Sequence, residues 1–151
     1  MFLKTQSAED RLRTWREIRQ RSYDNVEELL EEFASIKPVS RYLDYYTPKS
    51  WPNPFEIVSE GYLCQSGITL ILTATLINKG FITSDNLRFL GISNNINGAD
   101  GLVLFDDGKA YNFLPGEVVT EQYALDNSVQ FTKHIVPKDQ LFAWLLCSFI
   151  L

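Results

Sequence analysis

The chain has 151 residues, 45% of them hydrophobic and 13% aromatic, which is the size and composition of one globular domain with one core. Fourteen basic against nineteen acidic residues give a net charge of −5, and the arginines near the N-terminus alternate with acids on a predicted helix. Disorder and a nucleic-acid partner are therefore not expected.

Few residues are available for metal or cofactor chemistry. The two cysteines, Cys64 and Cys147, are too few for a disulfide framework and fit a reducing compartment, although a single bridge stays open. A phosphate-binding glycine loop and a Cys/His cluster are both missing from the sequence, so neither a cofactor nor a metal is expected. The N-terminus lacks the charged-then-apolar order of a signal peptide, so export by that route is not expected.

Two helices are predicted in residues 1–36. Ser7 and Asp10 form a capping arrangement at the start of the first helix. Ser22 or Asp24 can start the second helix, whose apolar residues recur with helical spacing while its acids face water. The apolar faces contain Leu12, Trp15 and Ile18 in the first helix and Val26, Leu29, Leu30 and Phe33 in the second.

The central element is the proline-free stretch from Cys64 to Lys79, which is followed by a glycine. Before it comes an aromatic, proline-rich connector (residues 37–55), whose prolines, together with Gly61, are expected to make the approach to the helix irregular. Apolar residues cover most of the helix circumference, so we expect it to be buried on nearly every side. Cys64 would then lie at or beside the first turn.

The chain after the central helix predicts an antiparallel sheet of about four or five strands. An Asp-Gly turn at residues 106–109 joins two of them in a hairpin, because Asp-Gly accepts the positive φ angles of a tight turn. Asp126 and Asn127 are expected to form the turn between the last two. The predicted strands are 87–92, 101–105, 110–114, 117–125 and 128–136, with a loop at 93–100. This order indicates an α+β domain whose sheet packs against the central helix.

The last stretch, residues 137–151, is almost entirely apolar. Pro137 can open a final helix, and its about 11 apolar residues are too few for a bilayer span of roughly 20 residues. We expect this helix to complete the core or to dock on another chain rather than to enter a membrane. The side chains expected at such a docking surface are Leu141, Phe142, Trp144, Leu145, Phe149 and Ile150. Residues 1–36, 37–136 and 137–151 are the three segments of a single compact domain.

The position of Cys64 raises the question of thiol chemistry. A cysteine at a helix N-terminus is favoured as thiolate by the helix dipole and by unpaired backbone N–H groups. A cysteine nucleophile also needs a base, usually histidine, and a carboxylate or amide that orients the base. The chain contains one histidine, His134.

The order of motifs resembles the core of the transglutaminase-like cysteine peptidase superfamily. The motifs are Trp-Pro-x-Pro-x-Glu at residues 51–56, Gly-x-x-Cys at 61–64, a long helix, Leu-Arg-Phe at 87–89 and the hairpin at 102–111. The resemblance covers roughly residues 42–136 and is greatest to small bacterial and phage-encoded members. It implies a papain-like core in which the cysteine-bearing helix packs on an antiparallel sheet.

The resemblance also implies where a catalytic triad would lie. Cys64 falls on the nucleophile, and the histidine position falls on Asp100 or Ala99. The aspartate position falls near residues 112–114, where no acid stands, and Gln65 replaces the family's acid after the cysteine. Two of three triad positions are therefore not filled, and a thiol without them loses most of the catalytic advantage. We expect no catalytic residues, with Cys64 as a vestigial nucleophile.

Other titratable residues have simpler interpretations. His134 is interpreted as a surface or strand-edge residue of the last strand. Glu56 and Glu60 would share a face of a helix, but the nearby prolines make this region a poor platform for glycosidase chemistry, so capping and solvation are favoured. Asp106 and Asp107 lack the spacing of a calcium loop and are explained by the turn. The tryptophans are interpreted as packing anchors: Trp15, Trp51 and Trp144.

The sequence therefore predicts a catalytically inactive transglutaminase-like domain that acts as a structural or assembly module. The concrete version is a tail, baseplate or neck subunit of a tailed phage, located in the virion if phage-encoded and otherwise in the cytoplasm. Its partners would be copies of itself or other virion subunits. The alternative is a peptidase, amidase or acyl-transfer enzyme that uses Cys64 with His134 or Asp100. A third possibility is a regulator that binds a host protein through residues 42–55.

Overall fold

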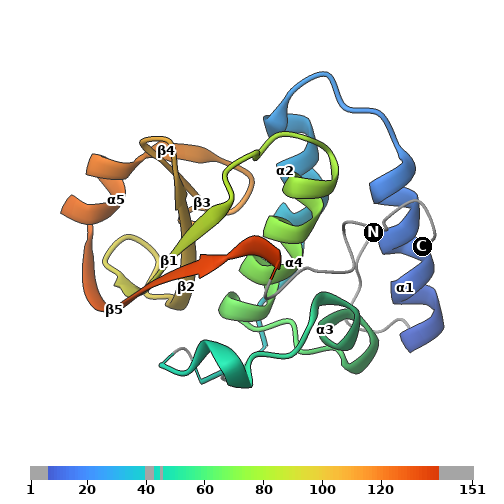
Figure 1. Ribbon diagram of the computed structural model, residues 1–151, viewed down its shortest axis with the longest axis horizontal. Helices are drawn as coiled ribbons and strands as arrows, with labels where there is room; N and C mark the ends of the chain where they lie inside the picture. The colour runs from blue at the N-terminus through green and yellow to red at the C-terminus, as the bar shows by residue number, and fades with distance from the viewer. Residues whose placement is uncertain (1–6, 40–42, 45, 140–151) are drawn as a thin grey trace.

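The computed structural model describes residues 7–39, 43–44 and 46–139. In this part of the chain, four α-helices lie on one side of an antiparallel sheet, and a fifth, short helix lies on the other side (Figure 1). The helices are α1 (Ala8–Gln20), α2 (Val26–Ala34), α3 (Pro54–Glu60), α4 (Gln65–Asn78) and α5 (Glu121–Asp126), with a short 3-10 helix η1 (Pro48–Ser50). The predicted α+β class is confirmed.

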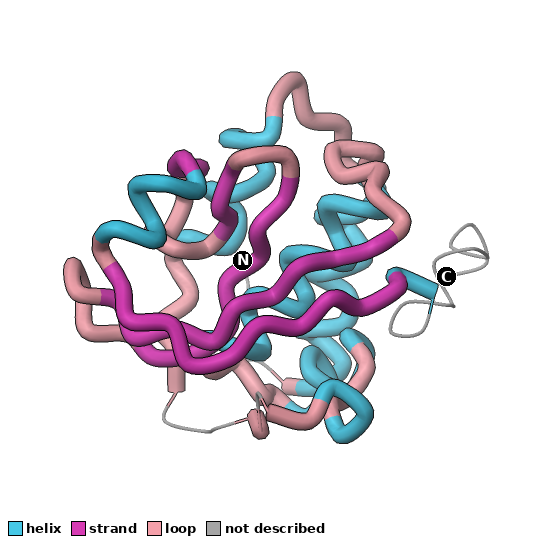
Figure 2. Tube along the Cα trace, turned by 60° about the vertical axis from the view of Figure 1, so that its left-hand side comes forward, coloured by secondary structure: helices cyan, strands magenta, loops and turns pink. Residues whose placement is uncertain are grey.

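The sheet has five strands in the order β4-β3-β2-β1-β5, and every neighbouring pair is antiparallel. The strands lie side by side in front of the helices in Figure 2. Their bounds are β1 (Asn86–Asn94), β2 (Asp100–Asp106), β3 (Lys109–Tyr111), β4 (Val118–Thr120) and β5 (Ser128–Pro137). The predicted Asp-Gly hairpin is confirmed as β2 and β3, with Asp106 opposite Lys109.

Both N-terminal helices form, and their caps follow local chemistry. The Ser7 side chain accepts a hydrogen bond from the backbone N–H of Asp10, as predicted. The second helix is capped by Asn25, whose side chain accepts from Glu28 N–H. The prediction of Ser22 or Asp24 as its start is therefore wrong. An N-cap side-chain oxygen reaches the backbone N–H three residues later, and Asn25 stands three positions before Glu28.

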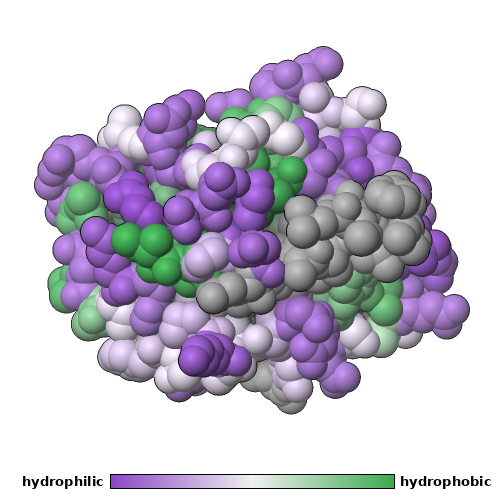
Figure 3. Space-filling view, viewed as in Figure 1, coloured by the Kyte–Doolittle hydropathy of each residue, from purple (hydrophilic) through white to green (hydrophobic). Residues whose placement is uncertain are grey.

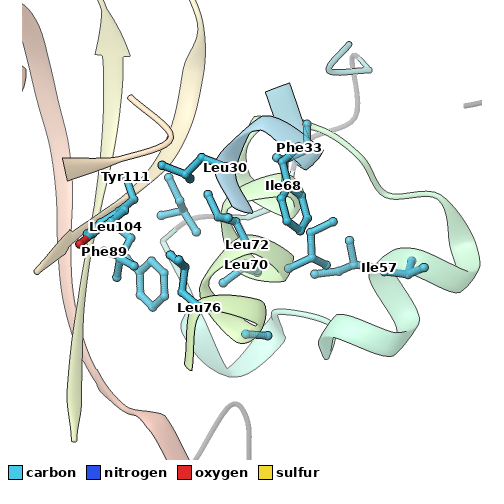
Figure 4. Close-up of a cluster of buried hydrophobic side chains, with 14 of the residues drawn as sticks. Leu30, Phe33, Ile57, Ile68, Leu70, Leu72, Leu76, Phe89, Leu104 and Tyr111 are labelled. Atoms are coloured by element: carbon cyan, nitrogen blue, oxygen red, sulfur yellow. The ribbon is translucent and has the colours of Figure 1, made fainter. Parts of the chain in front are cut away.

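The helix α4 is the central element, with every residue from 66 to 76 buried. Its apolar side chains meet α2 and α3 on one side and β1 and β2 on the other (Figure 4). Buried threonines satisfy their hydroxyls locally, because Thr73 and Thr75 donate to the carbonyls of Thr69 and Ile71 one turn earlier. Thr75 also accepts from the indole N–H of Trp15 at 2.9 Å, which attaches α1 to α4.

The opposite face of the sheet has a small core of its own. Side chains alternate between faces along a strand. Phe89 and Leu104 therefore point toward α4, while Leu90 and Val103 point away. The second core contains Leu90, Ile92, Val103, Phe105, Ala110, Phe113 and Ala124, the last of which comes from α5.

The predicted hairpin between residues 117–125 and 128–136 is wrong. β4 pairs with β3, β5 pairs with β1, and the two therefore lie at opposite edges of the sheet. Residues 121–126 form α5, whose first turn is capped by Thr120 accepting from Tyr123 N–H. The local capping chemistry and the burial of Ala124 outweigh the alternating pattern that favoured a strand.

The expected irregular approach to the central helix is also wrong in part, because α3 forms there. Asn53 and Glu56 make a complete capping box, and Pro54 takes the first helical position, where its missing N–H costs nothing. Gly61 then ends α3 in the left-handed conformation (φ 74°). The prolines therefore start a helix instead of preventing one.

Pro137 is the last residue of β5, and residues 138–139 are helical. The predicted docking residues, from Leu141 to Ile150, lie outside the described residues. Where the structure is described, no helix combines the length and hydrophobicity that a membrane span needs.

Candidate functional site

Cys64 is the N-cap of α4, so the predicted place of this residue at the helix start is correct. Cys64 is 5% exposed, and its sulfur accepts a hydrogen bond from Gly67 N–H at 3.4 Å. The connection from α3 is tight, since Tyr62 N–H donates to Ile57 O. A Cβ at Gly67 would lie 1.9 Å from the Tyr62 carbonyl oxygen, so only glycine fits beneath this turn.

A pocket of about 530 Å³ opens beside the cysteine. Its walls come from the connector, from α3 and from the turn before α4, and the lining residues are Leu43, Ser50, Trp51, Pro52, Glu56, Tyr62 and Cys64. The Trp-Pro-x-Pro-x-Glu motif therefore provides three of these residues. The structure brings this motif and Cys64 together at one pocket.

Contacts with three other parts of the chain hold Trp51 in place. Its indole N–H donates to the carbonyl of Asp44 at 2.7 Å. Its ring meets Phe89 of β1 and His134 of β5 edge-on, with ring centroids 5.6 Å and 5.7 Å apart. Edge-to-face aromatic pairs at these distances are favourable, so the ring is fixed on two sides.

His134 lies on β5 opposite Phe89, half-buried, and contacts Trp51. The prediction of a strand-edge residue holds, since β5 is an edge of the five-stranded sheet. Among residues 7–39, 43–44 and 46–139, the Cys64 sulfur has one hydrogen-bond partner, the N–H of Gly67. The structure therefore places the histidine against Trp51, a lining residue of the pocket, and without a hydrogen bond to the thiol.

Asp100 begins β2 beside the first turn of α4. The next residue, Gly101, packs so closely that a Cβ there would lie 2.9 Å from Gln65 Cβ and from Ser66 Oγ. Leu102 N–H then donates to the Ser66 hydroxyl at 3.0 Å. The carboxylate-bearing residue itself is exposed, and Ala99 before it is half-buried.

Asn112 follows β3 with a left-handed backbone (φ 67°) and a buried side chain. Its amide nitrogen donates to Thr69 Oγ1 at 2.8 Å, and Thr69 in turn donates to Leu102 O at 2.6 Å. Gln65 donates from its side chain to the Asn112 carbonyl at 2.9 Å. Neutral groups therefore join the first turns of α4 to the sheet, and one of them, Asn112, lies where the resemblance places the aspartate.

Sequence reasoning missed this network. The sequence indicates Gln65 only as a replacement for an acid and assigns no role to Thr69. A polar residue in an otherwise apolar helix was the available signal, because a buried hydroxyl needs a partner. In the part of the chain that is described, no group of three or more His, Cys, Asp or Glu side chains could hold a metal ion.

These elements form the transglutaminase-like fold. Its central helix is capped by a cysteine, and the second strand of its antiparallel sheet starts beside that helix. No family model matches the sequence, and no curated protein matches it. The fold is similar to that of LapG from Legionella pneumophila, a transglutaminase-like cysteine protease.

The similarity to LapG covers nearly the whole of both chains. The calcium-bound structure has a TM-score of 0.63 at 12% identity over 96% of this chain and 92% of that chain. The EGTA-treated structure has a TM-score of 0.59 at 16% identity over 93% of this chain and 89% of that chain. At these identities the likeness defines the fold, and the function has to be argued from the residues of this chain.

Proposed function

We propose that the chain is a non-catalytic transglutaminase-like domain that acts as a structural or assembly module. The main support is the environment of the Cys64 sulfur, which accepts from Gly67 N–H and, within the described residues, has no hydrogen bond to an imidazole. The ring of His134, the single histidine, packs on Trp51. A thiol with no base to take its proton lacks the group that makes such a cysteine an efficient nucleophile.

The two other triad positions support the same proposal. Asp100 is an exposed acid where the family has a base. Asn112 uses its amide to bind Thr69, and an amide neither accepts nor releases a proton near neutral pH. Neither residue replaces histidine, whose ordinary pKa suits general base catalysis at that pH.

An exposed edge of the sheet supports the assembly role. β5 pairs with β1 on one side only in the described part of the chain, and an edge strand offers free backbone N–H and C=O groups to another chain. Three of its hydrophobic side chains are exposed: Val129, Phe131 and Ile135. The left half of Figure 3 shows a small hydrophobic patch among polar residues over the sheet.

The concrete setting that we propose is a tail, baseplate or neck subunit of a tailed phage, with copies of the chain or other virion subunits as partners. This setting rests on the resemblance to small phage-encoded members. Mass spectrometry of purified virions tests it. Peptides of this chain in intact particles would support the setting, and their absence from particles while the chain is abundant in the infected-cell lysate would overturn it.

Assembly is tested by removing residues 138–151. We expect the full chain to form oligomers and the shortened chain to remain folded as a monomer, since an apolar segment of this size is an association surface. Light scattering on both proteins after size-exclusion chromatography gives the two masses, and circular dichroism checks the fold. An unchanged mass would count against the role of this segment, and a monomeric full chain would count against self-assembly.

The second candidate is a Cys64-dependent peptidase, amidase or acyl-transfer enzyme. It is favoured by the placement of Cys64 at a helix N-terminus beside a pocket, and by the similarity of the fold to a cysteine protease. Iodoacetamide alkylation, quantified at each cysteine by peptide mass spectrometry, separates the candidates. A working nucleophile is accessible and largely thiolate, so it reacts much faster than a free thiol near neutral pH. We expect slow alkylation.

A further inference from the structure

The strand β5 forms one end of the sheet. Within the described residues it pairs with β1 alone, and the ladder is regular from Thr132 to Pro137, because the shift in register falls at Phe131. The backbone N–H and C=O groups of an antiparallel strand point alternately to its two sides, so half of them point outward from an edge strand. The regular part of β5 therefore offers hydrogen-bonding groups to a further strand.

The side chains along this edge are apolar and carry little charge. Phe131 and Ile135 are 48% and 61% exposed. With histidine neutral, Lys133 is the one charged residue from Ser128 to Pro137, and the strand contains no earlier proline. Charges and prolines are the residues that protect edge strands from pairing with other chains. Because β5 has only one such charge, its sequence favours pairing.

We infer that β5 pairs with β5 of a second copy of the chain, in an antiparallel arrangement about a two-fold axis. A closed two-fold dimer uses the same surface on both copies. The net charge of −5 disfavours contact through acidic faces such as α2, where Glu27, Glu28 and Glu31 are exposed. β5 contains no acid, so two copies meet there with little repulsion. This inference rests on the proposed assembly role and names the partner.

The chain beyond β5 favours a second copy over an unrelated protein. The residues that follow the described part, 140–151, carry no formal charge and are mostly apolar. In an antiparallel pair the end of one β5 lies beside the start of the other, where Val129 is exposed. Each copy therefore brings the beginning of its apolar segment to an exposed apolar side chain of the other, and the symmetry makes this contact twice.

The single lysine of β5 selects the register of the pair. Like charges directly opposite each other destabilise a sheet, so Lys133 opposite Lys133 is disfavoured. Lys133 lies opposite Leu90 of β1, which points away from α4, and Ile135 shares that face because it is two residues further along the strand. The register that we propose places Lys133 of each copy opposite Ile135 of the other, where its aliphatic stem covers the exposed side chain.

Two substitutions at one position test this register. Sedimentation velocity of the full chain at several concentrations gives the dissociation constant of the dimer. Ile135→Lys places a lysine opposite Lys133 twice, so we expect at least about tenfold weaker dimerisation. Ile135→Glu places a carboxylate there instead, and we expect a dissociation constant within about threefold of the wild-type value. Net charge alone predicts the reverse order, because glutamate makes the chain more acidic.

Hydrogen exchange followed by mass spectrometry tests whether the backbone of β5 pairs. Peptides that cover residues 128–137 should exchange more slowly in the wild-type dimer than in the Ile135→Lys monomer, because outward N–H groups become bonded. Peptides that cover β4, the opposite edge of the sheet, are the control and should exchange equally. Circular dichroism checks that both variants keep the fold. Equal exchange of β5 in dimer and monomer would overturn the inference.

The outcomes separate this inference from the proposed function. A monomeric full chain would overturn the inference and leave other virion subunits as the proposed partners. A dimer that Ile135→Lys weakens no more than Ile135→Glu would overturn the pairing of β5 and keep self-assembly. Fast alkylation of Cys64 together with the expected order of the two variants would reject the non-catalytic role and support the dimer.

Discussion

The imidazole of His134 meets the indole of Trp51 edge-on, with ring centroids 5.7 Å apart and an interplanar angle of 86°. The histidine therefore supports one wall of the pocket that Cys64 also lines. A supporting role and a catalytic role for this residue make different predictions, because packing needs a ring and catalysis needs a titrating nitrogen.

Replacing His134 separates these two roles. His134→Ala should lower the free energy of unfolding by about 1 kcal/mol through loss of the edge contact, while His134→Phe should lower it by less than about 0.5 kcal/mol. Urea unfolding measures both. Cys64 alkylation should stay within about a factor of two in His134→Phe, whereas loss of a general base would slow it about 100-fold or more. That larger loss would assign the histidine to catalysis.

Asn112 is expected to be important for stability because it joins α4 to the sheet. Asn112→Ala removes the bond to Thr69 and places alanine in a left-handed backbone, so we expect a loss of about 2–3 kcal/mol. Asn112→Gly keeps the backbone relaxed and should lose only about 1–2 kcal/mol. Chemical denaturation gives both values. Equal losses would show that the backbone conformation contributes nothing.

Gly67 should tolerate no side chain. An alanine Cβ there would lie 1.9 Å from the Tyr62 carbonyl oxygen, which is backbone and cannot move aside, so Gly67→Ala should cost about 3 kcal/mol. Gly80→Ala is the control, because its site is open and carries only the left-handed strain of about 1 kcal/mol. Thermal unfolding compares them. A Gly67→Ala variant as stable as Gly80→Ala would show that the turn before α4 adapts.

Tyr111 should make stability depend on alkaline pH. Burial, with Asp106, Asp107 and Glu27 nearby, raises the pKa of its hydroxyl above the usual value. The folded state therefore keeps the proton longer than the unfolded state, and this contribution to stability is constant below about pH 10 and is lost above it. Tyr111→Phe, which cannot ionise, should gain stability relative to the wild-type protein between about pH 8 and pH 11.

Urea unfolding at several pH values within that range checks the Tyr111 prediction. Tyr23 also has a raised pKa, chiefly through burial, but it is present in both proteins and cancels in the comparison. The same difference in stability between the two proteins at every pH would contradict the assignment of the raised pKa to Tyr111.

Features set by neighbours in the sequence were predictable from it. The start of α4 at Cys64, the Asp-Gly hairpin and the cap at Ser7 each depend on a few adjacent residues, whose backbone preferences act over one turn. The motif order also indicated the fold. The local prediction that was wrong is the irregular approach around Pro54, where a helix forms. A proline disfavours the interior of a helix but favours its first position.

Contacts between distant residues were decided only by the tertiary structure. The sequence by itself determined that Cys64 would lie at or beside the first turn of a buried helix and that no second histidine could serve it. Packing decided that β5 pairs with β1, which brings His134 to Trp51, and that Gln65 and Thr69 bind the chain around Asn112. The physical reason is that strand pairing and buried hydrogen bonds depend on which surfaces meet, and local propensity does not encode that choice.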